Sequence, residues 1–154
     1  MRKGSHHLGR PFSYLTIASP LLFGTPFAPL WGMPQTPYDL LVRTREFSLA
    51  IIRLYASLPH TVEAQIIGKQ LLRAATSTGA HLREARFSRS DAEMLSKIEV
   101  GLQELEESRY WLELLVGSQI LNADATHILE KETGELIAIL VSSARRIKAR
   151  KKSA

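Results

Sequence analysis

The chain has no cysteine among its 154 residues. Disulfide bonds, thiolate nucleophiles and cysteine-ligated zinc sites are therefore excluded. No apolar run approaches the ~20 residues that a membrane-spanning helix needs, so we expect no contact with a membrane. A chain without cysteine is compatible with a reducing cytoplasm, and we expect a cytoplasmic protein. The length corresponds to about one domain.

The sequence also lacks the motifs of common enzyme classes. It has no GxxxxGKS or GxxxxGKT phosphate loop, no HExxH zinc motif and no GxSxG nucleophile elbow. Helical di-iron sites need Glu-x-x-His pairs, and none occurs. The nearest pattern, Asp124-x-x-His127, lies at a predicted helix start, where a capping role is expected. We therefore predict that the protein is not an enzyme and that it has no cofactor or metal.

Proline is almost absent after residue 38. The first 38 residues hold six of the seven prolines, three basic residues and no acidic residue. We predict that residues 1–36 form an irregular N-terminal extension. Three explanations are open: a secretory signal with an apolar run that prolines interrupt, a start codon that is Met33 instead of Met1, or an arm on the bundle surface. The arm would place these side chains there: Phe12, Tyr14, Leu21, Phe23, Phe27 and Trp31.

From residue 37 to 147, apolar residues recur at steps of three and four, which is the spacing of one helix face. The predicted helices start at Pro37 to Asp39, at Val62, near Asp91 and at Asn122 or Asp124. They end at residues 58, 85, 117 and 147. Their predicted inner residues are Leu40, Thr44, Phe47, Ile51, Leu54, Leu58, Ile67, Leu71, Ala74, Ala75, Thr78, Leu82, Leu95, Ile98, Leu102, Leu105, Leu112, Val116, Ile128 or Leu129, Thr133, Leu136, Leu140, Ala144 and Ile147. Short connections favour antiparallel neighbours, so we predict an all-α fold, an up-down-up-down antiparallel four-helix bundle over residues 37–147 with a basic tail at 148–154.

The second and third predicted helices carry the most distinctive pattern of the chain. Its segments are Leu71-Leu72-Arg73, Ser77-x-Gly79-Ala80, Arg83-Glu84-Ala85, Leu-x-Glu-Leu at 102–105 and Tyr-Trp-Leu-Glu-Leu-Leu at 110–115. In this order and spacing they resemble the bacterial four-helix-bundle family that is encoded within intervening sequences of large-subunit ribosomal RNA genes. The resemblance covers roughly residues 37–147, and it implies an up-down bundle, homopentamers and no assigned catalytic activity. His81 stands where the family usually has Asn.

The charge of the chain is unevenly distributed. The formal net charge is +5, but residues 145–154 alone carry six basic residues and no acidic one. Between residues 39 and 144 there are 11 basic and 15 acidic residues. The second helix is basic and the third acidic, and two explanations are open: pairing within one chain, or pairing of one protomer with the next in a ring. Within the chain, Glu99 and Glu106 are expected to pair with Arg73 or Arg83.

A second apolar stripe on the third helix favours self-association, because a single bundle needs only one apolar face per helix. The predicted oligomer interface contains Val100, Tyr110, Trp111 and Leu114. We therefore predict a non-enzymatic oligomeric protein that acts through assembly and partner binding.

The alternative is an accessory protein that binds the phosphates of RNA or DNA. The basic residues assigned to this role are Arg73, Arg83, Arg86, Arg89, Arg145, Arg146, Lys148, Arg150, Lys151 and Lys152. The motif residues singled out by the resemblance are Ser77, Gly79, Ala80, His81, Arg83 and Glu84.

Overall fold

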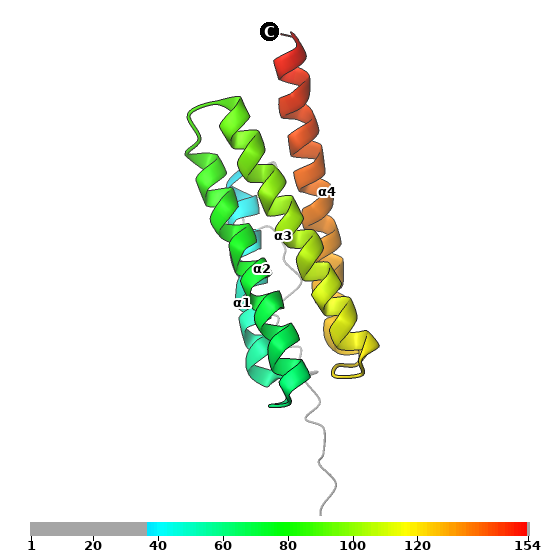
Figure 1. Cartoon of the computed structure of the whole chain (residues 1–154). Coiled ribbons are helices and arrows are strands. Elements are labelled where there is room, and N and C mark those ends of the chain that lie inside the picture. The colour runs from blue at the N-terminus through cyan, green and yellow to red at the C-terminus, as the bar shows by residue number, and fades with distance from the viewer. Residues whose placement is uncertain (1–36, 154) are drawn as a thin grey trace, which may run out of the picture. The chain divides into compact units, whose positions relative to one another are not determined.

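The computed structural model describes the backbone of residues 37–153 and the side chains of residues 40–150. Four helices follow one another: α1 (Pro37–Ser57), α2 (Val62–Arg86), α3 (Asp91–Gly117) and α4 (Ala123–Ser153). Each runs antiparallel to the one before it, and α4 returns beside α1 as well as α3 (Figure 1). The predicted all-α four-helix bundle is confirmed. The prediction of an irregular extension at residues 1–36, and that of Met33 as the start, lie outside the described residues.

The helices begin where the sequence supplies side-chain acceptors for free backbone amides. The Thr61 hydroxyl accepts from the Ala64 amide, and the Ser90 hydroxyl accepts from the Glu93 amide at 3.1 Å. The Asn122 side chain accepts from the Ala125 amide at 2.8 Å. Such caps stabilise a helix start by about 1 kcal/mol. The loops between the helices therefore lie close to the positions that the sequence predicts.

Most of the predicted inner residues form the core, but the prediction is wrong at the end of α3: Val116 is half-buried outside the core cluster, and Leu115 is fully buried in its place. Phe47, Ile51, Leu71, Leu105 and Leu112 are all at most 2% exposed. At the start of α4 the sequence left two candidates, and the structure selects Leu129, which is buried, over Ile128, which is 54% exposed.

Hydroxyl groups are buried in every helix. The Thr78 and Thr133 hydroxyls donate to the carbonyls of Ala74 and Leu129, four residues earlier in the same helix. Thr44, Ser108 and Thr126 are buried and also bonded within their own helices. Because a buried hydroxyl without a partner is costly, this local bonding allows small polar residues to pack in an apolar core.

Helix α4 is longer than the apolar spacing predicts. The sequence places its end at residue 147, but the helix continues through Ser153. Its C-terminal turns extend beyond the loop between α2 and α3 (Figure 1). The basic residues after Ile147 therefore lie on a helix.

Within the described part of the chain, no helix is long and apolar enough to cross a membrane.

Candidate functional site

The motif segment of α2 packs against α1. Gly79 is buried, and a Cβ atom placed on it would lie 3.6 Å from the Ser48 hydroxyl of α1. The same hydroxyl lies 3.0 Å from the Ala75 carbonyl and 2.8 Å from that of Thr44, so it bridges the two helices. Ser77 is half-buried and Ala80 is exposed. The small residues of this segment therefore serve helix packing.

His81 and Glu84 face α3 instead. The Glu84 carboxylate lies 2.5 Å from the Lys97 ammonium and 3.6 Å from Nδ1 of His81. Hydrogen bonding and charge from Lys97 lower the pKa of the Glu84 carboxyl below its usual value. Nδ1 of His81 is shielded from solvent and has no hydrogen-bond partner within the described residues. The His81 side chain itself packs on Gly101.

The structure does not bring the four arginines of the predicted phosphate-binding strip together. Arg73 contacts Glu104 and Glu107 of α3. Arg83 lies near Arg45 of α1, and Arg86 lines a groove next to α4. Arg89 is in the α2–α3 loop, 3.6 Å from Glu93. The four side chains therefore contact different parts of the bundle and do not form one continuous strip.

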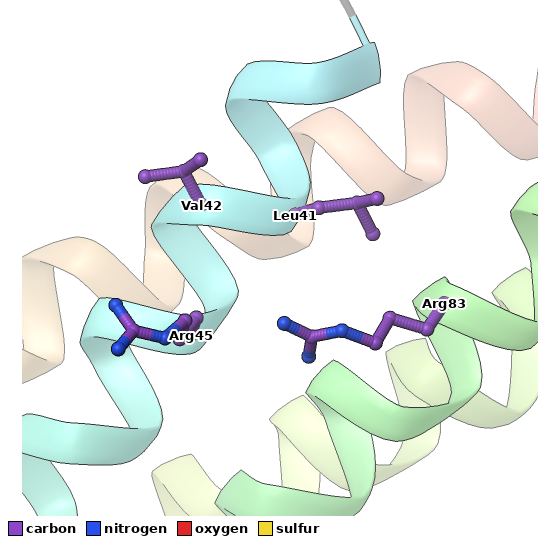
Figure 2. A pocket seen from close by; sticks show the side chains of 4 residues that line it. All are labelled: Leu41, Val42, Arg45 and Arg83. Carbon is purple, nitrogen blue, oxygen red and sulfur yellow. The ribbon is translucent and has the colours of Figure 1, made fainter.

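A shallow pocket of about 270 Å³ lies between α1 and α2. Leu41, Val42, Arg45 and Arg83 line it, and Figure 2 shows Arg83 reaching from α2 towards α1. Arg45 forms an ion pair with Glu46 at 2.7 Å. Of the described lining residues two are cationic and none is acidic, so they favour an anion over a cation.

The acidic residues of α3 mostly pair within the chain. Glu107 accepts hydrogen bonds from Arg73 and from Nε1 of Trp111, and both bonds lower the pKa of its carboxyl. The predicted partners of Glu99 and Glu106 are wrong: Glu99 lies 2.7 Å from Lys148 of α4, and Glu106 pairs with Arg109 of its own helix. These partners depend on how far each helix is rotated, which residue spacing alone does not fix. The structure thus uses the acidic side of α3 inside one protomer.

The basic residues of α4 are partly engaged. Lys148 pairs with Glu99, and Arg150 lies 3.4 Å from Asp91. Arg145 and Arg146 are exposed and have no ion-pair partner within the described residues. Lys151 and Lys152 lie in the last turns of the helix.

An apolar face lies on the outside of α3. Tyr110 is 52% exposed, and Val100, Trp111 and Leu114 are half-buried. The Tyr110 and Trp111 rings are 5.1 Å apart. We call these four residues the α3 outer face.

Two residues of α2 that sequence analysis missed extend this face. Val62 and Ile66 are 71% and 58% exposed. Because α2 and α3 are antiparallel and Arg73 meets Glu107, Ile66 lies level with about residue 114. Both residues lie outside the inner stripe of α2. Their spacing of four residues places them side by side on the helix surface, and this spacing was the signal in the sequence.

Among the described residues, no group of three or more histidine, aspartate or glutamate side chains is placed to hold a metal ion.

Comparison with known proteins identifies the family to which the chain is similar. The model of the 23S rRNA-intervening sequence protein family matches residues 38–142. A solved structure from Bacteroides thetaiotaomicron, described as a protein with unknown function from the S23 ribosomal protein family, is 29% identical with a TM-score of 0.67. The match covers 71% of this chain and 97% of that one. No curated protein matches the chain. The matched family model spans more than half of the sequence, and the chain therefore belongs to the family of 23S rRNA-intervening sequence proteins.

Proposed function

We propose that this protein is a non-enzymatic, oligomeric four-helix bundle that acts through assembly and partner binding. The α3 outer face is the observation that supports this most directly. Water disfavours exposed apolar surface by about 25 cal/mol per Å², and soluble monomers rarely display large contiguous apolar patches. Tyrosine and tryptophan at the centre of such a patch are typical of protein interfaces.

The charges of the bundle give this proposal less support than the apolar surface does. Most acidic residues of α3 are already paired within the chain, so attraction between a basic α2 and an acidic α3 of the next protomer is reduced. A head-to-tail contact through the α3 outer face would still close into a ring when the rotation allows. The homopentamer that the family resemblance implies is such a ring.

The test is the double substitution of Tyr110→Glu with Leu114→Glu. Light scattering after size exclusion should show an oligomer for the natural chain and a monomer for the variant, with helical circular dichroism unchanged. Phe87→Glu is the matched control, because Phe87 is 79% exposed but lies at the other end of α2 from Val62. A monomeric natural chain would refute self-association, and a variant that remains oligomeric would exclude this face as the interface.

A second candidate function is binding to the phosphates of RNA or DNA. It is favoured by one observation: the basic residues from 145 to 152 lie on a regular helix, which projects beyond the neighbouring loop. A helix fixes the spacing of its cations, and phosphate contacts need no base recognition.

This alternative is tested by fluorescence polarisation with a labelled single-stranded RNA. With three or more phosphate contacts, the affinity should fall at least about tenfold between ~50 and ~200 mM salt. Replacing Arg145, Lys148 and Arg150 with Gln should remove most of the binding. Substitution is preferable to deletion, because removing residues 145–154 would also remove the buried Ile147. Binding that does not change in the Gln variant would exclude these residues.

A further inference from the structure

A large open groove lies between α1 and α4, at the end of the bundle where α1 begins and α2 ends. Its volume is about 1220 Å³, and all four helices contribute to its lining. The floor is made by core residues such as Leu82, Ile98, Leu140 and Ile147. The groove exists because α1 and α4 contact each other less than the other neighbouring helices do. The floor residues are themselves buried, and the apolar side chains that a ligand could reach are partly exposed neighbours such as Leu41, Met94 and Ile139.

Among the described residues, the charged side chains that line the groove are all basic: Arg43, Arg86, Arg146 and Arg150. Outside the groove, Arg43 contacts Glu132 and Glu135, and Arg150 lies near Asp91. Arg146 is exposed and has no ion-pair partner within the described residues, so positive charge remains at the rim. An occupant with apolar and acidic groups would complement both features.

The size of the groove favours a macromolecular segment over a small ligand. Sites for small ligands are about 300–1,000 Å³ and enclose most of the ligand. Along α4 the lining runs from Ala138 to Arg150, which is about 18 Å at ~1.5 Å per residue. That length corresponds to roughly three turns of a helix lying alongside α4.

The lining also favours a helix over an extended peptide or a nucleic acid. An extended peptide would leave its backbone amides and carbonyls against an apolar floor, where unpaired polar groups are costly. The Ser143 hydroxyl already donates to the Ile139 carbonyl at 2.9 Å. None of the described residues that line the groove is aromatic, so they offer no platform on which bases could stack. A helix satisfies its own backbone and presents only side chains.

We propose that this groove is the docking site for an amphipathic helix of a partner protein, with an apolar face flanked by acidic residues. The apolar face covers the partly exposed apolar lining between α1 and α4, and the acidic residues meet Arg146 at the rim. The groove and the α3 outer face are built from different residues. This proposal is therefore independent of self-association, and either can fail without the other.

The probe is a synthetic peptide of about 14 residues, or two heptads, with leucine at the first, fourth and fifth positions of each heptad and glutamate at the others. A peptide with lysine in place of every glutamate is its control. Fluorescence anisotropy with the full chain should show saturable binding of the glutamate peptide, with a gain of helical circular dichroism. The lysine peptide should bind at least about tenfold more weakly, because like charges oppose it.

The sharpest variants are neighbours on α4. Arg146→Glu reverses a charge in the groove, and Arg145→Glu reverses an equally exposed charge outside it. We expect the first to weaken binding about tenfold and the second to change it less than about twofold. Equal losses, equal binding of the two peptides, or no saturable binding at millimolar peptide would overturn the proposal.

Two further outcomes would assign the groove to another occupant and overturn the proposal as well. If the peptide dissociates the natural oligomer in light scattering, a second copy of the chain fills the groove. If RNA binding requires Arg146 while neither peptide binds, the groove belongs to a nucleic acid.

Discussion

Two glycines of α2, Gly68 and Gly79, have different surroundings although both are buried. A Cβ atom on Gly68 would lie 2.5 Å from a methyl group of Leu58 and 2.8 Å from the Tyr55 ring. On Gly79 it would meet Ser48 at 3.6 Å, which is ordinary van der Waals contact. The approach of α1 therefore requires a glycine at position 68 but leaves room for a methyl group at position 79.

The two alanine substitutions should consequently act in opposite directions. Gly68→Ala should lower the free energy of unfolding by about 1–3 kcal/mol, because buried side chains would have to move. Gly79→Ala should raise it by about 0.5–1 kcal/mol, because alanine has the higher helix propensity. Urea unfolding followed by circular dichroism measures both. Two changes of the same sign would contradict this reading of the α1–α2 contact.

Glu107 links stability to pH. Hydrogen bonds from Arg73 and Trp111 lower the pKa of its carboxyl below the ordinary 4.5. A lowered pKa in the folded state means that the interaction stabilises the protein above pH 4.5 and is lost as the pH falls through the lowered value. Glu107→Gln should lower the free energy of unfolding by about 0.5–1 kcal/mol at neutral pH. The difference from the natural chain should shrink towards pH 3.

Glu113→Gln is the control for this pH effect. Glu113 is an exposed glutamate of the same helix and has no ion-pair partner among the described residues. Its substitution should leave thermal unfolding unchanged at both pH values. A pH-independent effect of Glu107→Gln would show that packing of the side chain matters more than its charge.

At the scale of the elements, one side chain joins the first and last helices. Nε and Nη2 of Arg43 donate to the two carboxylate oxygens of Glu132 at 2.9 and 2.7 Å, and Nη2 also lies 2.8 Å from Glu135. The hydrogen bond to Glu132 raises the pKa of the guanidinium. The Arg43 side chain is only 17% exposed, so solvent screens this pair less than the other pairs on the surface.

Arg43→Lys keeps the charge but cannot form the paired hydrogen bonds of a guanidinium. We expect the free energy of unfolding to fall by about 1 kcal/mol, since such charge-assisted bonds are stronger than ordinary ones. Arg45→Lys is the matched control, because Arg45 is exposed and pairs only with the adjacent Glu46. Its effect in the same chemical denaturation should be within about 0.5 kcal/mol. Equal losses in the two variants would remove Arg43 as the link between α1 and α4.

Helix starts could be predicted from the sequence better than the end of α4. Thr61, Ser90 and Asn122 mark the starts chemically, because their side chains accept hydrogen bonds from free amides. The prediction ended α4 at Ile147, where the apolar spacing stops. Lysine, arginine and alanine have high helix propensity and no proline or glycine follows in the sequence, so the helix continues although residues 148–150 are exposed.

The candidate surfaces were predictable only in part. The spacing of apolar residues in α3 was enough to separate its inner stripe from its outer apolar residues. Residues on one face of a helix recur every three to four positions, and the outer residues fall outside that series. The groove could not be predicted, since it depends on the distance between α1 and α4. No pattern in the sequence relates these two helices to each other. The dispersal of Arg73, Arg83 and Arg86 is likewise a result of helix rotation and of the partners on each side.

At the scale of the whole molecule, α2 and α3 form the most extensive pair of the bundle. They share more contacts than any other two helices, and α1 and α4 add to them from either side. Leu71, Leu105 and Leu112 are fully buried at their centre. The core therefore lies mainly between α2 and α3, and the first and last helices of the chain complete it.

The groove between α1 and α4 has a consequence for how the molecule opens. Amides in the last turns of α4 and the first turns of α1 should exchange with deuterium through local opening, because little of either helix is covered there. Amides around Leu71, Leu105 and Leu112 should exchange only on global unfolding. Mass spectrometry of exchange, read peptide by peptide, should therefore show protection rising from the rim of the groove to the middle of α2 and α3, and uniform protection along α4 would contradict it. The edge of the molecule that is best suited to receive another helix would then also be the first part of the bundle to loosen.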